Sequence, residues 1–272
     1  MFSRFKKEKV NTSRRMWAAV VFVVMIVVNG IAGSTTLLNG QNTAAVSDNN
    51  PNLFAPAGFT FAIWGVIYLL LAGYVAYQLG WFGKLRRAKV SVATIERVTP
   101  YFIATSILNV FWLFAWQYEV LWLSVALMLG LLYSLVRIEE ILKDKIYTKA
   151  ERMLIRNPFS VYFGWISVAT IANVTTWLVS MGWTGGGIKP DAWTIIMLII
   201  GALLALAVMY RNMNCAYGLV FVWAFYGILS KHVNVFDGQH QAVIGALWAL
   251  IAVLTVVFGW TLHRVYRAQT KR

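Results

Sequence analysis

Apolar runs about as long as a lipid bilayer is thick recur along this 272-residue chain, separated by short polar segments. A helix needs about 20 apolar residues to cross ~30 Å of hydrocarbon. Such a helix satisfies its own backbone hydrogen bonds, so the repeated runs predict an all-α, polytopic transmembrane helical bundle. The runs are 16–33, 60–80, 100–117, 120–138, 158–180, 192–210, 215–230 and 243–263. We therefore expect about eight helices.

The composition supports a membrane protein, because 60% of the residues are hydrophobic and only 12% are charged. A soluble domain carries about 25% charged residues. The net charge of +14 could suggest a nucleic-acid partner, but all of the 24 Lys and Arg residues except Lys189 and Lys231 fall on one side of the helix map. This positive-inside pattern predicts an even number of spans, cytoplasmic N- and C-termini and no nucleic-acid partner. Short basic loops are typical of a bacterial inner membrane protein.

The first run has an alternative interpretation as a cleaved signal peptide, because basic residues precede it and Gly33-Ser34 follow it. The run is longer than the apolar region of a typical signal peptide, which favours a helix of the bundle. The segment 34–57 is polar and is predicted to be an external loop. Another external segment carries His232, Asp237 and His240, whose spacing matches no metal site and which we interpret as solvated loop residues.

Apart from Arg137 and His263 at the ends of their runs, the predicted spans contain no Asp, Glu, Lys, Arg or His. Proton- or ion-coupled transport usually needs ionisable groups inside the membrane, so the pattern argues against a pump. Aromatic and amide residues instead recur on single helix faces. The second predicted helix has Phe61, Trp64, Tyr68 and Leu71 on one face. The third has Ser106, Asn109, Trp112, Leu113 and Trp116. The fifth has Trp165, Ala169, Asn173 and Thr176. They predict a shared pocket for an apolar aromatic ligand, although Asn109 and Asn173 could equally serve as hydrogen-bonded links between helices.

Three short motifs resemble those of the tryptophan-rich sensory proteins related to the mitochondrial translocator protein, or peripheral-type benzodiazepine receptor (the TspO/MBR family). Pro56, Trp64 and Tyr68 match the family's proline followed by Trp-x-x-x-Tyr. Leu108, Asn109 and Trp112 are similar to Leu-Asn-x-x-Trp. Tyr162, Trp165, Ala169 and Asn173 match Tyr-x-x-Trp-x-x-x-Ala-x-x-x-Asn. Two positions differ from the family pattern. Ala57 replaces the second residue of the family's double proline, and Val161 replaces the proline that usually precedes the Tyr of the third motif. The chain therefore resembles a distant, extended member of the family.

The resemblance implies that residues 1–182 form a five-helix domain with a ligand pocket, and that the loop 34–57 covers it. Helices in 188–272 would be an additional three-helix segment without a counterpart in five-helix relatives. By the same resemblance the ligand is a porphyrin-like tetrapyrrole, and no cofactor is required. The residues that it assigns to ligand binding are Pro56, Phe61, Trp64, Tyr68, Asn109, Trp112, Tyr162, Trp165, Ala169 and Asn173.

The function predicted from these observations is a membrane receptor or carrier acting as a sensor or transport aid, with no catalytic residues and no metal. An eight-helix small-molecule transporter without charged coupling residues is the alternative. A scaffold whose Trp and Asn residues only pack is a third interpretation. The expected partners are the lipid bilayer, a small apolar aromatic ligand and, by analogy with the family, a second copy of the chain. Helices after residue 188 could cover the surface that five-helix relatives use to dimerise.

Overall fold

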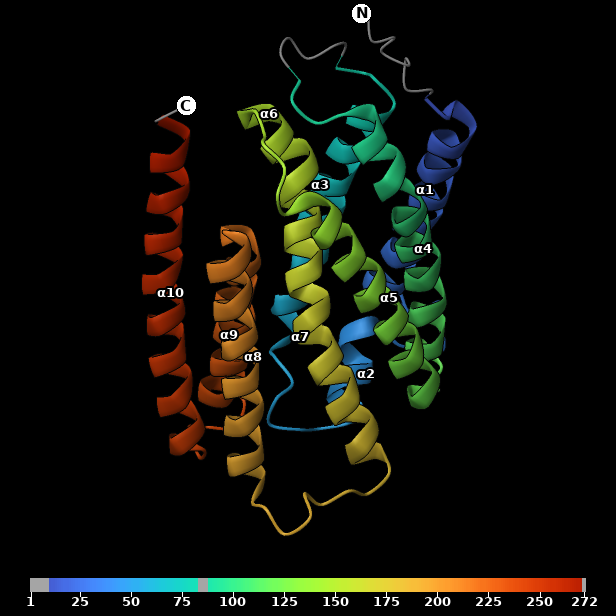
Figure 1. Cartoon of the computed structure of the whole chain (residues 1–272). Coiled ribbons are helices and arrows are strands. Elements are labelled where there is room, and N and C mark those ends of the chain that lie inside the picture. Colours follow the sequence, from blue (N-terminus) through green and yellow to red (C-terminus); the bar gives the residue numbers. More distant parts are fainter. Residues whose placement is uncertain (1–9, 83–87, 271–272) are drawn as a thin grey trace, which may run out of the picture.

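The computed structural model describes residues 10–82 and 88–270, and the regular structure within these ranges is helical, without a β-strand (Figure 1). Eight helices are long and apolar enough to span a membrane, which confirms the predicted polytopic bundle. Counted with the helical segments that lead into α3 and α7, they are α1 (Thr12–Ser34), α3 (Ile63–Gln78), α4 (Val92–Gln117), α5 (Leu121–Leu142), α7 (Asn157–Ser180), α8 (Pro190–Asn212), α9 (Cys215–Asn234) and α10 (Gln241–Thr270). The chain is an integral, multi-pass membrane protein.

Shorter helical segments extend or connect these spans. A 3₁₀ turn, η1 (Gly58–Ala62), leads directly into α3, and the loop between α1 and α3 contains a short helix, α2 (Thr43–Asn49). Helix α6 (Lys149–Glu151) and a π-helical turn, η2 (Arg152–Arg156), lead into α7. Helical structure before α7 therefore begins nine residues ahead of the predicted run 158–180, because the polar residues of α6 and η2 also form helical turns.

The first five spans form a closed ring. Helix α1 packs on α4, α4 on α5, α5 on α7, α7 on α3, and α3 returns to α1 with the sparsest of these contacts. The ring is filled by aromatic side chains; inside it Tyr74 makes edge contacts with Phe102 and Phe159 at 5.2 and 4.7 Å between ring centroids. In this structure α1 is a member of the bundle.

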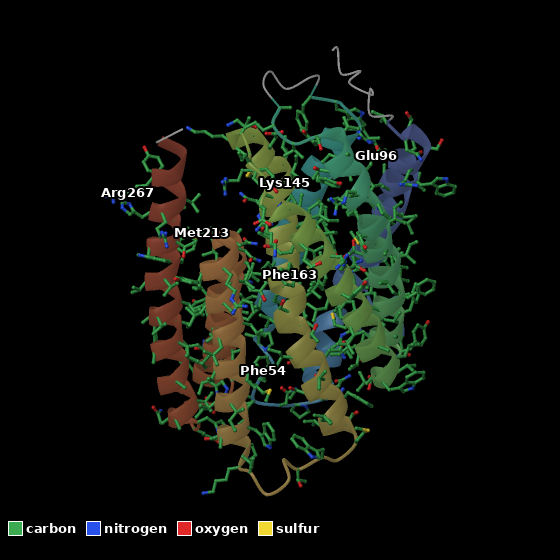
Figure 2. The ribbon with its side chains drawn as sticks, in the orientation of Figure 1. Phe54, Glu96, Lys145, Phe163, Met213 and Arg267 are labelled. Carbon is green, nitrogen blue, oxygen red and sulfur yellow. The ribbon has the colours of Figure 1, made fainter. Side chains whose placement is uncertain are left out.

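The last three spans pack on one side of this ring. Helix α9 lies against α7 and contacts η1, while α8 and α10 pack against α9 and each other. Helix α10 forms the outer edge of the molecule, and it ends at the same end of the bundle at which α1 begins (Figure 1). Figure 2 shows side chains filling the spaces between these helices.

Close packing between α9 and its neighbours depends on glycines. A Cβ atom on Gly164 of α7 would lie 2.9 Å from the Val220 side chain, and one on Gly227 would overlap the Thr60 hydroxyl oxygen. Only a residue without a side chain lets the backbones approach this closely, as is common between membrane helices. The three C-terminal helices are therefore fitted tightly to the five-helix ring.

Candidate ligand pocket

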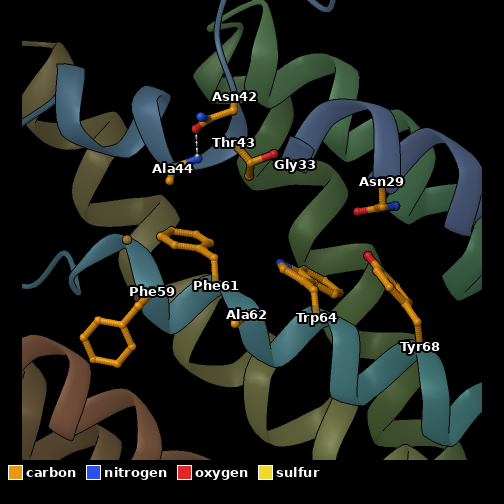
Figure 3. Close-up of a pocket in the computed structure, with 11 residues that line it drawn as sticks. Asn29, Gly33, Asn42, Thr43, Ala44, Phe59, Phe61, Ala62, Trp64 and Tyr68 are labelled. Atoms are coloured by element: carbon orange, nitrogen blue, oxygen red, sulfur yellow. Dashed lines mark hydrogen bonds between the residues drawn. The ribbon is translucent and has the colours of Figure 1, made fainter. Parts of the chain in front are cut away.

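A cavity of about 300 Å³ lies between α1, α2 and the segment from η1 to the start of α3 (Figure 3). It occupies the position at which the ring is most loosely closed, between α1 and α3. Phe61, Trp64 and Tyr68 form its aromatic side, and Asn29 and Asn42 contribute amide groups. The lining is thus mainly apolar with a few polar groups, which is typical of small-molecule sites.

The loop that covers this cavity is folded rather than irregular. Asn42 caps α2 by accepting hydrogen bonds from the backbone N–H groups of Ala44 and Ala45, at 3.1 and 3.0 Å. The indole N–H of Trp116 donates to the Thr43 carbonyl at 3.1 Å, and the Gln117 amide donates to the Gln41 carbonyl at 2.9 Å. Two side chains at the end of α4 thereby hold α2 across the mouth of the pocket, so the loop 34–57 lies where a lid would.

Trp64 is the centre of the aromatic side. Its ring is stacked on Tyr68, with centroids 5.5 Å apart and an interplanar angle of 18°. It also makes edge contacts with Tyr162 and Trp165, at 5.9 and 6.1 Å. Aromatic pairs favour these two geometries, which fix the indole in one orientation.

Two polar atoms beside this cluster have no hydrogen-bond partner within the described residues, the Tyr68 hydroxyl and the Trp165 indole nitrogen, and both are buried. Figure 3 shows the Tyr68 hydroxyl pointing toward Asn29, which lines the same cavity. A buried polar group normally has a partner, because leaving it unpaired costs ~1–3 kcal/mol. The Tyr68 hydroxyl is therefore available to a polar group of a ligand.

The structure divides the predicted site residues between the cavity surface and the interior behind it. Phe61, Trp64 and Tyr68 line the cavity. The amide of Asn109 is bonded to Asn29 at 2.6 Å and to Tyr162 at 3.3 Å. The remaining predicted residues also lie off the cavity surface in this structure; they are Pro56, Trp112, Trp165, Ala169 and Asn173.

Asn173 joins three helices. Its carbonyl oxygen accepts a hydrogen bond from the indole N–H of Trp112 at 2.9 Å, and its amide donates to the Ser124 hydroxyl at 2.7 Å. Both Asn109 and Asn173 thus form interhelical links, as in the packing interpretation of these residues. The motif residues of α4 and α7 thus pack behind the residues that line the cavity.

Other lining residues were not predicted from the sequence, namely Asn29, Gly33, Asn42, Thr43, Ala44, Gly58, Phe59 and Ala62. Asn29 carries a usable signal, because it is an amide within an otherwise apolar span. Asn42 through Ala44 carry none beyond a helix-capping residue, since their place over the cavity depends on how the loop folds back.

Helix α9 also holds the covering loop. The Ala57 N–H donates to the Gly227 carbonyl at 3.0 Å, and the Lys231 ammonium pairs with Asp48 at 2.7 Å. A ring nitrogen of His232 lies 2.9 Å from the Leu53 carbonyl. His232 is fully buried on α9, so the prediction that it is a solvated loop residue is wrong; the helix continues four residues beyond the end of the apolar run.

One protein family matches this chain. The sequence pattern of the family described as TSPO-like protein matches residues 15–260. The chain belongs to the TSPO-like family. No curated protein and no solved structure matches it.

The match confirms the family resemblance derived from the three motifs and extends it. It runs from α1 through most of α10, so the helices that follow Pro190 are part of the matched pattern of this TSPO-like chain. The three motifs alone leave residues after 188 outside the resemblance to five-helix relatives. In the structure, α9 contacts the loop over the pocket, so these helices and the five-helix ring form one structural unit.

Proposed function

We propose that this TSPO-like chain is a membrane receptor or carrier that binds a flat, apolar aromatic ligand of the tetrapyrrole class in the lidded cavity. The observation that carries the proposal is the stacked pair Trp64–Tyr68 at the cavity surface, beneath a loop that covers the opening. A planar macrocycle would stack on the side of these rings that faces the cavity, and its polar substituents would meet the Tyr68 hydroxyl and the Asn29 amide.

The size of the cavity bears on how the ligand enters. About 300 Å³ is at the small end of the range for small-molecule sites, which runs from about 300 to 1,000 Å³. A tetrapyrrole therefore requires α2 to move away from η1. The loop is joined to α4 and α9 by hydrogen bonds and one ion pair rather than by continuous helix packing, and this movement must break those that hold α2.

The proposal is for binding without covalent chemistry or a required cofactor, because the lining consists of aromatic, small, hydroxyl and amide side chains. We also propose that the basic end of the bundle faces the cytoplasm of a bacterial cell, following the positive-inside rule. The cavity then lies toward the opposite face of the membrane, and the lid is external.

The proposal is tested by titrating the purified protein in detergent with protoporphyrin IX and following tryptophan fluorescence. We expect saturable quenching that Trp64→Phe weakens at least tenfold. Trp122→Phe is the matched control, because it also removes one of the 13 indoles but from a position that is 60% exposed on α5. Its affinity should equal that of the wild type.

Two results would overturn the proposal. One is quenching that rises without saturation, as in an empty micelle, for every variant. The other is an equal loss of affinity for protoporphyrin IX in the Trp64 and Trp122 variants. Saturable binding of a smaller aromatic probe, with no binding of protoporphyrin IX, would retain the pocket but exclude the tetrapyrrole class.

A further inference from the structure

A second hollow lies at the opposite end of the bundle from the lidded cavity, where α1 begins and α10 ends (Figure 1). It has a volume of about 570 Å³ and is lined by residues 143–149, by η2, by the turn between α8 and α9, and by the end of α10. Figure 2 shows that Met213, in that turn, lies deeper in the bundle than Lys145 and Arg267. The short α8–α9 turn thus forms the floor of a groove between two longer walls, which we call the basic groove.

The lining of the basic groove is strongly cationic. It contains the basic residues Lys89, Lys143, Lys145, Lys149, Arg152, Arg156 and Arg264, and Asp144 is its one acidic residue among those that the structure describes. The side chains of Lys143, Lys145 and Lys149 are exposed, and no carboxylate of residues 10–82 or 88–270 lies within 4 Å of their ammonium groups. Unpaired cations that share one hollow repel one another, so an anion bound there is stabilised by all of them.

The floor of the groove is held in place by a buried ion pair. Arg156 donates two hydrogen bonds of 2.6 Å to the Glu139 carboxylate, and the Asn212 amide donates to the same carboxylate at 2.9 Å. Both members of the ion pair are about 5% exposed. These bonds tie η2, α5 and the α8–α9 turn together, so the groove does not depend on flexible loops for its shape.

The walls are also ordered. The Arg152 guanidinium lies over the Tyr147 ring, 5.8 Å from its centroid, and Arg264 lies over the Trp260 ring at 4.9 Å. Burial raises the pKa of the Tyr147 phenol further above its ordinary value of about 10, so the ring beneath the arginine is neutral. Cations stacked on aromatic faces lose less freedom when they bind an anion. In addition, η2 is a π-helical turn, a feature that occurs often at functional sites.

Exposed apolar side chains border the cationic hollow. Ile146 and Met153, next to its lysine and arginine residues, are 51% and 54% exposed, and Leu262 on α10 is 49% exposed. The groove floor lies below the ends of the flanking helices (Figure 2). A ligand that fits this surface carries both a phosphate group and a hydrocarbon chain.

We propose that the basic groove binds the phosphate-bearing headgroup of an anionic phospholipid, with its acyl chains running down the outer surface of α10 and η2. Basic hollows between membrane helices bind such headgroups in general, and each Lys or Arg near an anionic lipid contributes ~1 kcal/mol. The site is separate from the lidded cavity and does not depend on the tetrapyrrole proposal.

The test uses the full chain purified in detergent and titrated with dioctanoyl phosphatidylglycerol, with bound lipid counted by native mass spectrometry. The variant Lys143→Gln/Lys145→Gln/Lys149→Gln removes three groove cations. The matched control Arg14→Gln/Arg97→Gln/Arg211→Gln removes three basic residues that do not line the groove. None of the six side chains is buried, so both variants are expected to fold, which their unfolding temperatures will show.

We expect one lipid to bind saturably, with at least tenfold weaker binding by the groove variant and less than twofold change in the control. Dioctanoyl phosphatidylcholine should bind at least tenfold more weakly than the anionic lipid. An equal loss of lipid affinity in both variants would show that the lipid is attracted to the basic surface in general, and would overturn the proposed site. Displacement of the lipid by millimolar inorganic phosphate, or equally tight binding of glycerol 3-phosphate, would assign the groove to a soluble phosphate compound and overturn the lipid assignment.

Discussion

The carboxylate of Glu139 on α5 accepts two hydrogen bonds of 2.6 Å from the guanidinium of Arg156, and both side chains are buried. Asn214 lies 3.3 Å from both carboxylate oxygens, so the same acid also anchors the start of α9. A charge at the end of an apolar run is expected at the membrane surface. Here the α8–α9 turn covers it, which makes this pair a joint between the five-helix ring and the C-terminal helices.

Breaking this pair should destabilise the protein strongly. Glu139→Gln leaves the Arg156 charge buried without a counter-charge, for which the typical cost is ~3–5 kcal/mol. The free energy of unfolding measured by denaturant titration in detergent will test this. Glu140→Gln is the control, because its partner Arg137 and Glu140 itself are 44% and 48% exposed, and such pairs contribute ~0–1 kcal/mol. Equal effects of the two substitutions would contradict the role of the buried pair.

Substitution by alanine should lower the stability of the protein at Gly227 and raise it at Gly245. Gly227→Ala places a methyl group against Thr60 and must displace η1 or α9, which should cost ~1–3 kcal/mol and loosen the cavity wall. On Gly245 of α10 an added methyl group would meet no heavy atom within 4 Å, so Gly245→Ala should stabilise the helix by ~0.5–1 kcal/mol. Unfolding temperatures measure both. A Gly227→Ala variant as stable as Gly245→Ala would show that α9 is not closely fitted to η1.

The Tyr68 hydroxyl should matter for ligand binding more than for stability. Tyr68→Phe removes a buried hydroxyl that has no partner within the described residues, so the free energy of unfolding should change by less than ~0.5 kcal/mol. The affinity for protoporphyrin IX should fall ~3- to 10-fold, the value of one hydrogen bond. Tyr162→Phe should show the reverse, because its hydroxyl accepts a hydrogen bond from Asn109 and lies behind the cavity. Unchanged affinity in Tyr68→Phe would remove this residue from the proposed site.

The lid should open more easily when its tie to α9 is lost. Lys231→Met removes the partner of Asp48, whose side chain is 58% exposed, so the contribution of the pair is ~1 kcal/mol. We expect ligand dissociation to become about fivefold faster and amide hydrogen exchange in residues 43–54 to increase. Lys189→Met is the control, since Lys189 is an exposed lysine predicted on the same external face. A dissociation rate unchanged by Lys231→Met would show that the pair does not restrain the lid.

Much of the arrangement could be predicted from the sequence, and particular residues show where prediction stopped. Trp64 and Tyr68 are four residues apart on one helix, so helical periodicity alone places them on one face. The same periodicity places Asn109 and Asn173 on inner faces. Periodicity does not say which partner an inner amide meets, and in the structure both amides bond to other helices.

Other features have no local signal. Helix α2 has seven residues, too few for an apolar period to be recognised, and the sequence predicts it only as part of a loop. Glu139 lies at a helix end in the sequence pattern and gives no sign of burial, because the turn that buries it comes more than 70 residues later. The contact of His232 with Leu53 likewise joins residues 179 positions apart in the chain.

The sequence by itself determined the membrane class, the number of spans and the family, because hydrophobic length and motif spacing are properties of single helices. Only the tertiary structure decided which aromatic residues face the cavity, that α9 holds the covering loop, and that the basic residues of four separate segments line one groove. These features depend on contacts between segments distant in the chain, and hydrophobic patterning constrains the face that a helix buries without specifying its neighbour.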